Sequence, residues 1–228
     1  MSDSHNQDPI YEAKKNMYAT PEEAERYNRK HARTKKDVLE EGCLLKGLAD
    51  VPHGALVLDM PCGTGKLVHF LRKQGYRVNG CDSSDNVLAV ARKRYVTDSG
   101  EELDGNPDVN IEQQDGFNMT YPNDHFDAVV CNRLLHHFHN PDTRRKLLTE
   151  LARVSRGPIV ISFFCSESFS ALRFRIKSRL KGENPTSRIP IPLETLKADI
   201  KACGLKLDAV YYTRRWVSSQ TYVKLSRP

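Results

Sequence analysis

The chain has 228 residues, of which 39% are hydrophobic and 28% charged, and its formal net charge at pH 7 is +6. This length suits one α/β domain with a full hydrophobic core, and the composition excludes a disordered chain. No stretch approaches the roughly 18 consecutive apolar residues of a transmembrane helix, so the sequence predicts none. The positive charge favours acidic partners such as nucleic acid, phosphorylated compounds or an anionic membrane surface.

The N-terminal sequence MSDSHNQDPIYEAKKN is polar and lacks the apolar centre of a signal peptide. We therefore expect residues 1–19 to form a flexible tail or a lid. The six cysteines show no C-x-x-C spacing, and several lie in apolar runs. They are Cys43, Cys62, Cys81, Cys131, Cys165 and Cys203. We expect them to be buried and reduced, in a cytoplasmic protein.

A helical region is predicted over residues 20–50. Thr20 is a suitable capping residue, Pro21 suits the first helical position, and Glu22 and Glu23 follow in the first turn. Strand and helix patterns then alternate along the chain. We expect strands over 55–60, 76–82, 109–115, 126–132 and 158–164, with helices over 67–75, 86–95 and 141–155. Repeated units of this length predict a parallel sheet covered by helices on both faces.

The last quarter of the chain breaks this alternation. Residues 168–192 form a basic insertion, which we expect to act as a lid or to help bind the substrate. A helix over 193–204 and two strands over 205–213 and 215–226 follow, and the two strands can pair as an antiparallel hairpin. The prediction is one Rossmann-like domain over 20–228. Its fold class is α/β, a doubly wound and mostly parallel seven-stranded sheet with a C-terminal hairpin, and a ligand binds at the carboxyl ends of the strands.

The stretch VLDMPCGTGK, residues 57–66, ends in a tight turn that would bring backbone N–H groups close to a cofactor. A phosphate-binding P-loop needs a glycine where Met60 stands and a hydroxyl where Leu67 stands. A nicotinamide fingerprint needs a third glycine where Val68 stands. The sequence therefore argues against a P-loop that binds phosphate and against a nicotinamide cofactor.

The longer stretch VLDMPCGTGKLVHFLRKQGYRVNGCDSSDNVLAVARKR resembles the first two motifs of class I S-adenosylmethionine-dependent methyltransferases. The resemblance covers roughly residues 55–165, where several separate motifs fall in the expected order. The first motif of that family is commonly an acid followed by x-G-x-G-x-G. Here Pro61 stands where the first glycine usually is, and it makes the turn stiffer. The resemblance implies S-adenosylmethionine as cofactor and S-adenosylhomocysteine as product.

The motif residues also suit this cofactor chemically. Asp59 can order the loop and attract the cationic end of the methionine part, and Gly63 and Gly65 let the backbone approach without a Cβ clash. The N-terminus of the next helix offers N–H groups to the cofactor carboxylate. Asp82, at the end of the second strand, can accept both ribose hydroxyls. A single acid at a strand end more often caps a helix, but polar residues at four successive strand ends favour a binding site.

The resemblance implies further contacts. Asp115, or its neighbours Gly116 and Phe117, would contact the adenine, and the loop beginning at Asn132 would pass under the methionine part. An N-terminal helix would cover the cofactor with an aromatic and a basic residue, offered here by Tyr18, Arg26, Tyr27 and Arg33. The predicted cofactor-binding residues are Asp59, Pro61, Gly63, Thr64, Gly65, Asp82, Ser83, Asp115, Gly116, Phe117, Asn132, Arg133 and Tyr27.

Three histidines lie just past the fourth predicted strand, in LLHHFHN. We interpret His136 and His137 as a general base or as groups that position the substrate, because histidine titrates near neutral pH. The alternative is that one of them packs against the cofactor or stabilises the loop. A metal site in H-H-x-H lacks a carboxylate partner within the motif, so no metal is predicted.

The basic insertion does not by itself identify the substrate. Its residues Arg173, Arg175, Lys177, Arg179 and Lys181 alternate with apolar residues at helical spacing, Phe169, Leu172, Ile176 and Leu180. Such a helix can bind an anionic membrane surface or a phosphorylated substrate, or it can simply pack its apolar side on the domain. We expect a methyltransferase acting on oxygen or nitrogen of a small-molecule, lipid-linked or sugar-linked acceptor, in the cytoplasm or peripheral to the inner membrane. A tRNA or rRNA methyltransferase and a non-catalytic S-adenosylmethionine-binding protein are the alternatives.

Overall fold

The fold is taken from a computed structural model, which describes residues 20, 22–23, 34–181 and 189–228 and, for Arg179 and Lys181, the backbone alone. The strands are β1 (Leu56–Asp59), β2 (Arg77–Asp82), β3 (Val109–Gln113), β4 (Ala128–Cys131), β5 (Ile159–Phe164), β6 (Lys206–Tyr212) and β7 (Gln220–Ser226). The helices are α3 (Lys35–Gly47), α4 (Lys66–Lys73), α5 (Asp85–Ser99), α6 (Pro141–Val154), α7 (Phe169–Lys181) and α8 (Leu193–Ala202), with a short 3-10 turn, η2 (Leu135–His137).

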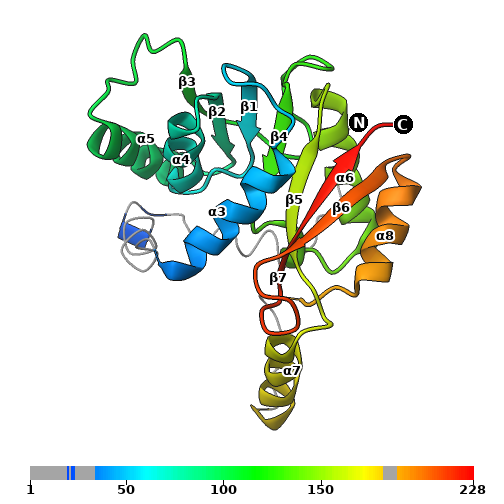
Figure 1. The fold of residues 1–228 in the computed structure, drawn as a ribbon. Coiled ribbons are helices and arrows are strands. Elements are labelled where there is room, and N and C mark those ends of the chain that lie inside the picture. Colours follow the sequence, from blue (N-terminus) through cyan, green and yellow to red (C-terminus); the bar gives the residue numbers. More distant parts are fainter. Residues whose placement is uncertain (1–19, 21, 24–33, 182–188) are drawn as a thin grey trace, which may run out of the picture.

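Seven strands of the described chain form one sheet, in the order β3-β2-β1-β4-β5-β7-β6 (Figure 1). β1 pairs in parallel with both β2 and β4, whereas β7 is antiparallel to both β5 and β6. The predicted doubly wound sheet with a C-terminal hairpin is therefore confirmed. Because the chain winds outward in both directions from β1 and β4, their carboxyl ends form the switch point where sheets of this kind bind ligands.

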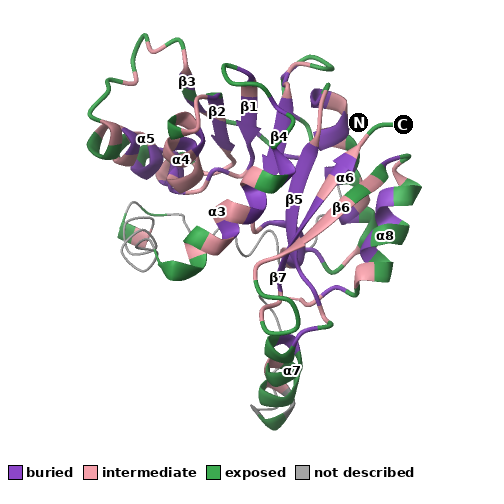
Figure 2. Cartoon of the chain, viewed as in Figure 1, coloured by how far each residue is buried: buried purple, intermediate pink, exposed green. Residues whose placement is uncertain are grey.

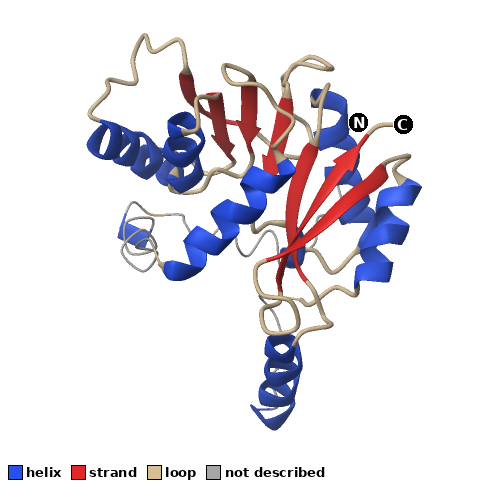
Figure 3. Cartoon of the chain, viewed as in Figure 1, coloured by secondary structure: helices blue, strands red, loops and turns tan. Residues whose placement is uncertain are grey.

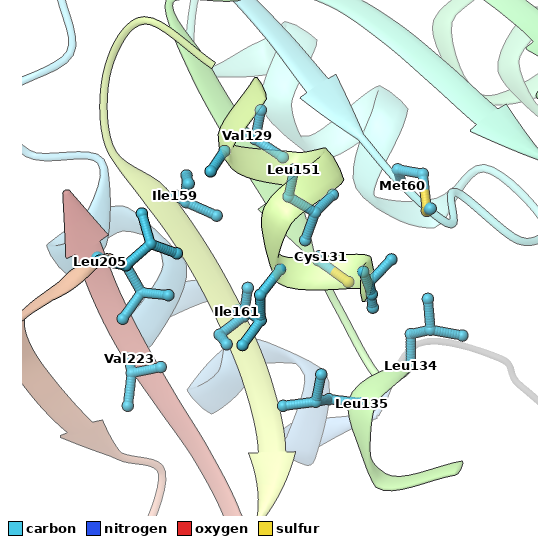
Figure 4. Close-up of a cluster of buried hydrophobic side chains, with 14 of the residues drawn as sticks. Met60, Val129, Cys131, Leu134, Leu135, Leu151, Ile159, Ile161, Leu205 and Val223 are labelled. Carbon is cyan, nitrogen blue, oxygen red and sulfur yellow. The ribbon is translucent and has the colours of Figure 1, made fainter. Parts of the chain in front are cut away.

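Helices cover both faces of the sheet (Figure 3). Consecutive strand residues point to opposite faces, so Ala128 and Val130 of β4 join the core beneath α3, α4 and α5, while Val129 and Cys131 join the core beneath α6 and α8. Figure 4 shows this second core, where side chains from β4 and β5 meet Leu151 of α6. Burial on both faces explains why β4 is apolar throughout, and β5 apolar except at Ser162, rather than alternating.

The predicted helical region 20–50 contains two helix starts. Thr20 and Glu23 exchange backbone-to-side-chain hydrogen bonds at 3.3 Å, as the predicted cap requires. A second start, at Thr34, was not predicted: this residue is extended, and its side chain and that of Asp37 form a reciprocal capping box for α3. The helical pattern of the sequence continues through Thr34 and does not reveal this second start, although T-x-x-D is a recognisable capping signal. The predicted helical region therefore holds more than one helix start.

All six cysteines are free thiols, and five of them are buried. Cys203 is only partly buried because it follows α8 at the helix end, so the expectation that all six are buried was wrong for it. Within the described residues, no helix combines the length and apolar character needed to cross a bilayer.

Candidate active site

The turn after β1 has the tight backbone that its glycines predict. The Gly65 N–H donates to the Cys62 carbonyl at 3.0 Å, and Gly63 and Gly65 have φ angles of 53° and 76°. Only glycine adopts such angles without strain. A Cβ on Gly65 would also lie 3.1 Å from Ala91, so this glycine lets the turn pack directly on α5. Pro61 enters the turn through a cis peptide bond from Met60.

Asp59 lies at the end of β1 and is fully buried. Neither of its carboxylate oxygens has a hydrogen-bond partner among the described residues. Burial raises the pKa of Asp59 well above its ordinary value, and the neighbouring Asp82 carboxylate raises it further. A buried carboxylate with no donor is costly, so this group is suited to receive a positively charged or N–H-bearing ligand.

Asp82 closes the turn from the next strand. One of its oxygens accepts the Gly63 N–H at 3.2 Å, and the other accepts the Ser84 N–H at 3.1 Å. Burial raises the pKa of Asp82, and these backbone donors lower it in part. Each carboxylate oxygen keeps a further acceptor site, so Asp82 can hold the turn and still accept hydroxyl groups from a ligand.

Two other predicted cofactor-binding residues, Thr64 and Ser83, form hydrogen bonds within the protein. The Thr64 side chain is buried and accepts a hydrogen bond from the Arg94 guanidinium at 3.0 Å, which ties the turn to α5. The Ser83 carbonyl accepts the Gln113 amide at 2.9 Å, which joins the ends of β2 and β3. Both residues therefore help to hold the turn and the strand ends around the site in place.

Asp115, Gly116 and Phe117 follow β3 as predicted. Asp115 is exposed and its side chain accepts the Phe117 N–H at 3.0 Å, which forms a tight turn. A Cβ on Gly116 would collide with the Met60 side chain, so glycine lets this turn approach the turn after β1. The Phe117 ring meets Phe138 edge to face, with centroids 5.5 Å apart.

A polar network joins the end of β4 to α3. The Arg133 guanidinium donates to Glu40 at 2.8 and 3.0 Å and to Asp37 at 3.2 Å. The Tyr222 hydroxyl, from β7, contacts Glu40 at 3.2 Å and Asn132 at 2.9 Å. Glu40 is buried, so this network fixes α3 across the carboxyl end of the sheet. Asn132 and Arg133 were predicted from sequence, whereas Asp37, Glu40 and Tyr222 were missed because no local pattern links them.

Gln220 was also missed. Its side chain is 1% exposed, and neither amide atom has a hydrogen-bond partner among the described residues. Burial and the neighbouring Glu40 raise the pKa of the Tyr222 hydroxyl, and Arg133 and the nearby Gln220 side chain lower it in part. Gln220 pairs with Phe164 at the carboxyl end of β5. The Gln220 amide is therefore a second buried polar group at this end of the sheet.

The two predicted histidines differ in exposure. His136 is buried, and its ring stacks on Phe164 with centroids 3.9 Å apart. His137 is partly exposed and its ring lies 4.1 Å from that of His136. Tyr27, like the other lid candidates Tyr18, Arg26 and Arg33, lies outside the described residues. Among the described residues, no group of three or more histidine, cysteine or acidic side chains is placed to hold a metal ion.

The raised pKa of Asp59 leads to a prediction about stability. Since the folded protein holds this proton to a higher pH than the unfolded chain does, the free energy of unfolding falls as the pH rises above the unfolded pKa of about 3.9. We expect Asp59→Asn to remove this part of the decline and to gain up to about 1.4 kcal/mol per pH unit relative to wild type. Asp82, whose pKa is also raised, continues to contribute its own part of the decline in the free energy of unfolding.

Urea denaturation of the ligand-free protein between about pH 4 and about pH 8 measures this difference. Asp85→Asn is the matched control, because Asp85 is an exposed carboxylate in the first turn of α5. It should leave the pH dependence unchanged. Equal pH slopes for Asp59→Asn and wild type would contradict the raised pKa.

Comparison with known proteins points to one family. Residues 57–157 match the family model described as a methyltransferase domain. Methyltransferase GfsG of Streptomyces halstedii is 36% identical over 108 residues, which are 47% of this chain and 36% of that protein. The ubiquinone biosynthesis O-methyltransferase of Azoarcus sp. (strain BH72) is 29% identical over 123 residues, 54% of this chain and 49% of that protein.

A tRNA (carboxymethyluridine(34)-5-O)-methyltransferase of Arabidopsis thaliana is 28% identical over 122 residues, 53% of this chain and 26% of that protein. The chain therefore spans about half, or less, of the length of these curated relatives.

Solved structures extend the likeness in fold to most of the chain. Magnesium protoporphyrin IX methyltransferase (ChlM) from Synechocystis PCC 6803, with bound SAH, superposes with a TM-score of 0.69 at 15% identity. The match covers 90% of this chain and 94% of that one. The family match over residues 57–157, the sheet order and the turn after β1 agree with one another, and the sheet has the fold of the S-adenosylmethionine-dependent methyltransferases whose structures it matches.

Proposed function

We propose that this chain transfers a methyl group from S-adenosylmethionine to an oxygen or nitrogen of a small-molecule, lipid-linked or sugar-linked acceptor. The observation that carries the cofactor assignment is the buried Asp59 carboxylate, which has no partner among the described residues and lies beside the glycine turn. S-adenosylmethionine supplies a methyl group already activated by its sulfonium, together with an ammonium group that suits such a carboxylate. The ChlM structure, which holds SAH, supports this assignment by its fold.

The residues around the turn fit the rest of the cofactor. Gly63 and Gly65 present backbone N–H groups without side chains in the way, and α4 begins directly after them with its positive end. Asp82 would accept the ribose hydroxyls. Asp115, Gly116 and Phe117 would line the adenine, and Asn132 and Arg133 the methionine part. A contact from Tyr27 in the N-terminal lid remains a prediction.

The acceptor would lie beside η2 and the end of β5. The protein's main task there is placement, because an activated methyl group needs an in-line nucleophile more than it needs acid–base help. We propose His137 rather than His136 as the acceptor-facing histidine, because His137 is partly exposed while His136 is buried against Phe164. The Gln220 amide would position a polar group of the acceptor.

Calorimetry with S-adenosylmethionine, and separately with NADH, tests the cofactor first. We expect binding of S-adenosylmethionine and none of NADH; binding of NADH without binding of S-adenosylmethionine would contradict the proposal. Release of S-adenosylhomocysteine over a panel of hydroxyl and amine acceptors, free and lipid-linked, then tests the reaction. With a turned-over acceptor, His137→Gln should flatten the pH profile if His137 is the base, whereas an unchanged profile would leave it a positioning role only.

Two alternative functions remain to be tested. The net charge of +6 and the tRNA-modifying relative favour an RNA acceptor, which the same assay with bulk tRNA would reveal. Binding of S-adenosylmethionine with no turnover over the whole panel would favour a non-catalytic binding protein. The predicted location, in the cytoplasm or peripheral to the inner membrane, stays a prediction, and a surface suited to a membrane is described next.

A further inference from the structure

Helix α7 projects from the body of the protein at the edge of the sheet where β5 ends (Figure 1). Figure 2 shows most of its length as exposed. It is joined to the domain mainly through its first turn, where Ala171 is buried and the Phe169 N–H donates to the Trp216 carbonyl at 2.8 Å. Ser170 adds a hydrogen bond of 2.8 Å from the Ser219 N–H. Most of the described side chains in the remainder of the helix are exposed.

The apolar side of α7 does not pack on the domain. Phe169, Leu172, Ile176 and Leu180 are 71%, 51%, 51% and 83% exposed. At about 100° per residue these four side chains fall within a stripe roughly 80° wide. Monomeric soluble proteins rarely leave a contiguous apolar stripe of this kind in water. The packing of this face onto the domain, one of the three interpretations that the sequence allowed, is therefore excluded for the described structure.

The loop between β6 and β7 continues this surface. Trp216 and Val217 are 57% and 55% exposed, and Trp216 lies next to the first turn of α7. The Arg215 guanidinium lies over the Trp216 ring, 5.1 Å from its centroid. We call these six exposed apolar residues the α7 patch: Phe169, Leu172, Ile176, Leu180, Trp216 and Val217.

Charge selects the partner of the α7 patch. The segment FSALRFRIKSRLK contains no acidic residue, and the helical period places Arg173 and Lys177 along one side of the stripe and Arg175 along the other. Arg214 and Arg215 add positive charge in the neighbouring loop. A second copy of the chain would bring two basic helices together, and nucleic acid would leave the aliphatic side chains in water. An anionic lipid surface can bury the apolar stripe and can also bind the basic side chains on either side of it.

We propose that the α7 patch binds the interface of an anionic lipid bilayer, with the stripe in the lipid and the basic residues at the headgroups. This inference is independent of the proposed acceptor, since it concerns binding alone. It has one consequence for the site. Because α7 follows β5 at the carboxyl edge of the sheet, docking turns that edge towards the membrane, where a lipid-linked molecule could enter.

Sedimentation with vesicles tests this surface without cofactor or acceptor. We expect the full chain to bind phosphatidylcholine vesicles containing phosphatidylglycerol at least about tenfold more strongly than pure phosphatidylcholine, and to lose most of that preference in high salt. The double variant Leu172→Ser, Ile176→Ser should bind at least about tenfold more weakly. Val38→Ser is its control, because Val38 is 53% exposed on α3, and it should bind as wild type does.

A second pair of variants isolates the charge. Arg173→Glu with Lys177→Glu should abolish the preference for phosphatidylglycerol, whereas Lys146→Glu with Lys201→Glu makes the same charge change on α6 and α8 and should lower binding far less. All these side chains are exposed, and circular dichroism confirms that each variant is folded. Absence of vesicle binding by wild type, or equal losses in both charge pairs, would overturn the proposal. So would a dimer in light scattering that Leu172→Ser, Ile176→Ser dissociates, since a second copy would then be the occupant.

Discussion

Replacing Asp82 with Ala is expected to weaken S-adenosylmethionine binding by roughly 100-fold. A carboxylate that accepts two hydroxyl groups contributes charge-assisted hydrogen bonds of about 1.5–3 kcal/mol each, and a loss of about 3 kcal/mol corresponds to this factor. In the structure the same carboxylate also holds the turn, through the Gly63 and Ser84 N–H groups. The substitution therefore removes a ligand contact and loosens the backbone that approaches the cofactor. Isothermal calorimetry measures the affinity directly.

Asp85→Ala is the matched control for this experiment. Asp85 is three residues further on and exposed, so its removal changes the charge equally without touching the turn. We expect its affinity to stay within about threefold of wild type. A thermal unfolding curve for Asp82→Ala shows whether the domain remains folded. Unchanged affinity in a folded Asp82→Ala protein would remove the ribose assignment.

The largest expected effect on stability comes from Arg144→Met. Arg144 and Asp199 are both buried, and their side chains meet at 2.7 Å between α6 and α8. The Arg144 guanidinium also donates to the carbonyls of Phe138 and His139, just after η2. Removing one member of a buried ion pair leaves the other charge poorly compensated, which costs about 3–5 kcal/mol. We expect a loss of this size in the free energy of unfolding, measured by urea denaturation.

Arg145→Met supplies a close comparison. Arg145 contacts the same Asp199 carboxylate at 2.9 Å, but its side chain is 41% exposed. Because water screens and replaces an exposed charge, we expect this substitution to cost about 1 kcal/mol or less. Similar losses in the two variants would show that burial does not decide the strength of this cluster. The loss in Arg144→Met should also disturb the loop that carries His137, and so lower turnover more than Arg145→Met does.

Local features of the chain predicted the sheet and the turn well. The alternation of strand and helix patterns predicted five strands and the C-terminal hairpin two more, and each of the seven begins or ends within a few residues of its predicted position. Asp59 and Asp82 were identified because they lie at the ends of predicted strands, in a segment that resembles the first two motifs of the family. The positive φ of Gly63 and Gly65 follows from their place in a tight turn. These properties depend on residues close together in the sequence.

The polar network above the sheet could not be predicted in this way. Arg133 and Glu40 are 93 residues apart, and Tyr222 is 182 residues from Glu40. Nothing in the composition of α3 marks Glu40 as a buried acid rather than a surface one. The unsatisfied amide of Gln220 depends equally on what packs around it, because a glutamine in a strand is ordinary until its surroundings are known.

The sequence by itself determined the fold class, the glycine turn and the acids at the strand ends, because these depend on local backbone preference and on the period of apolar residues. Only the tertiary structure decided which polar groups stay without a partner and which apolar face stays in water. The pattern of α7 suits a packed helix and an exposed one equally well, and only the position of the helix beyond the edge of the sheet distinguishes them. Burial is a property of contacts between distant segments, and no single segment contains that information.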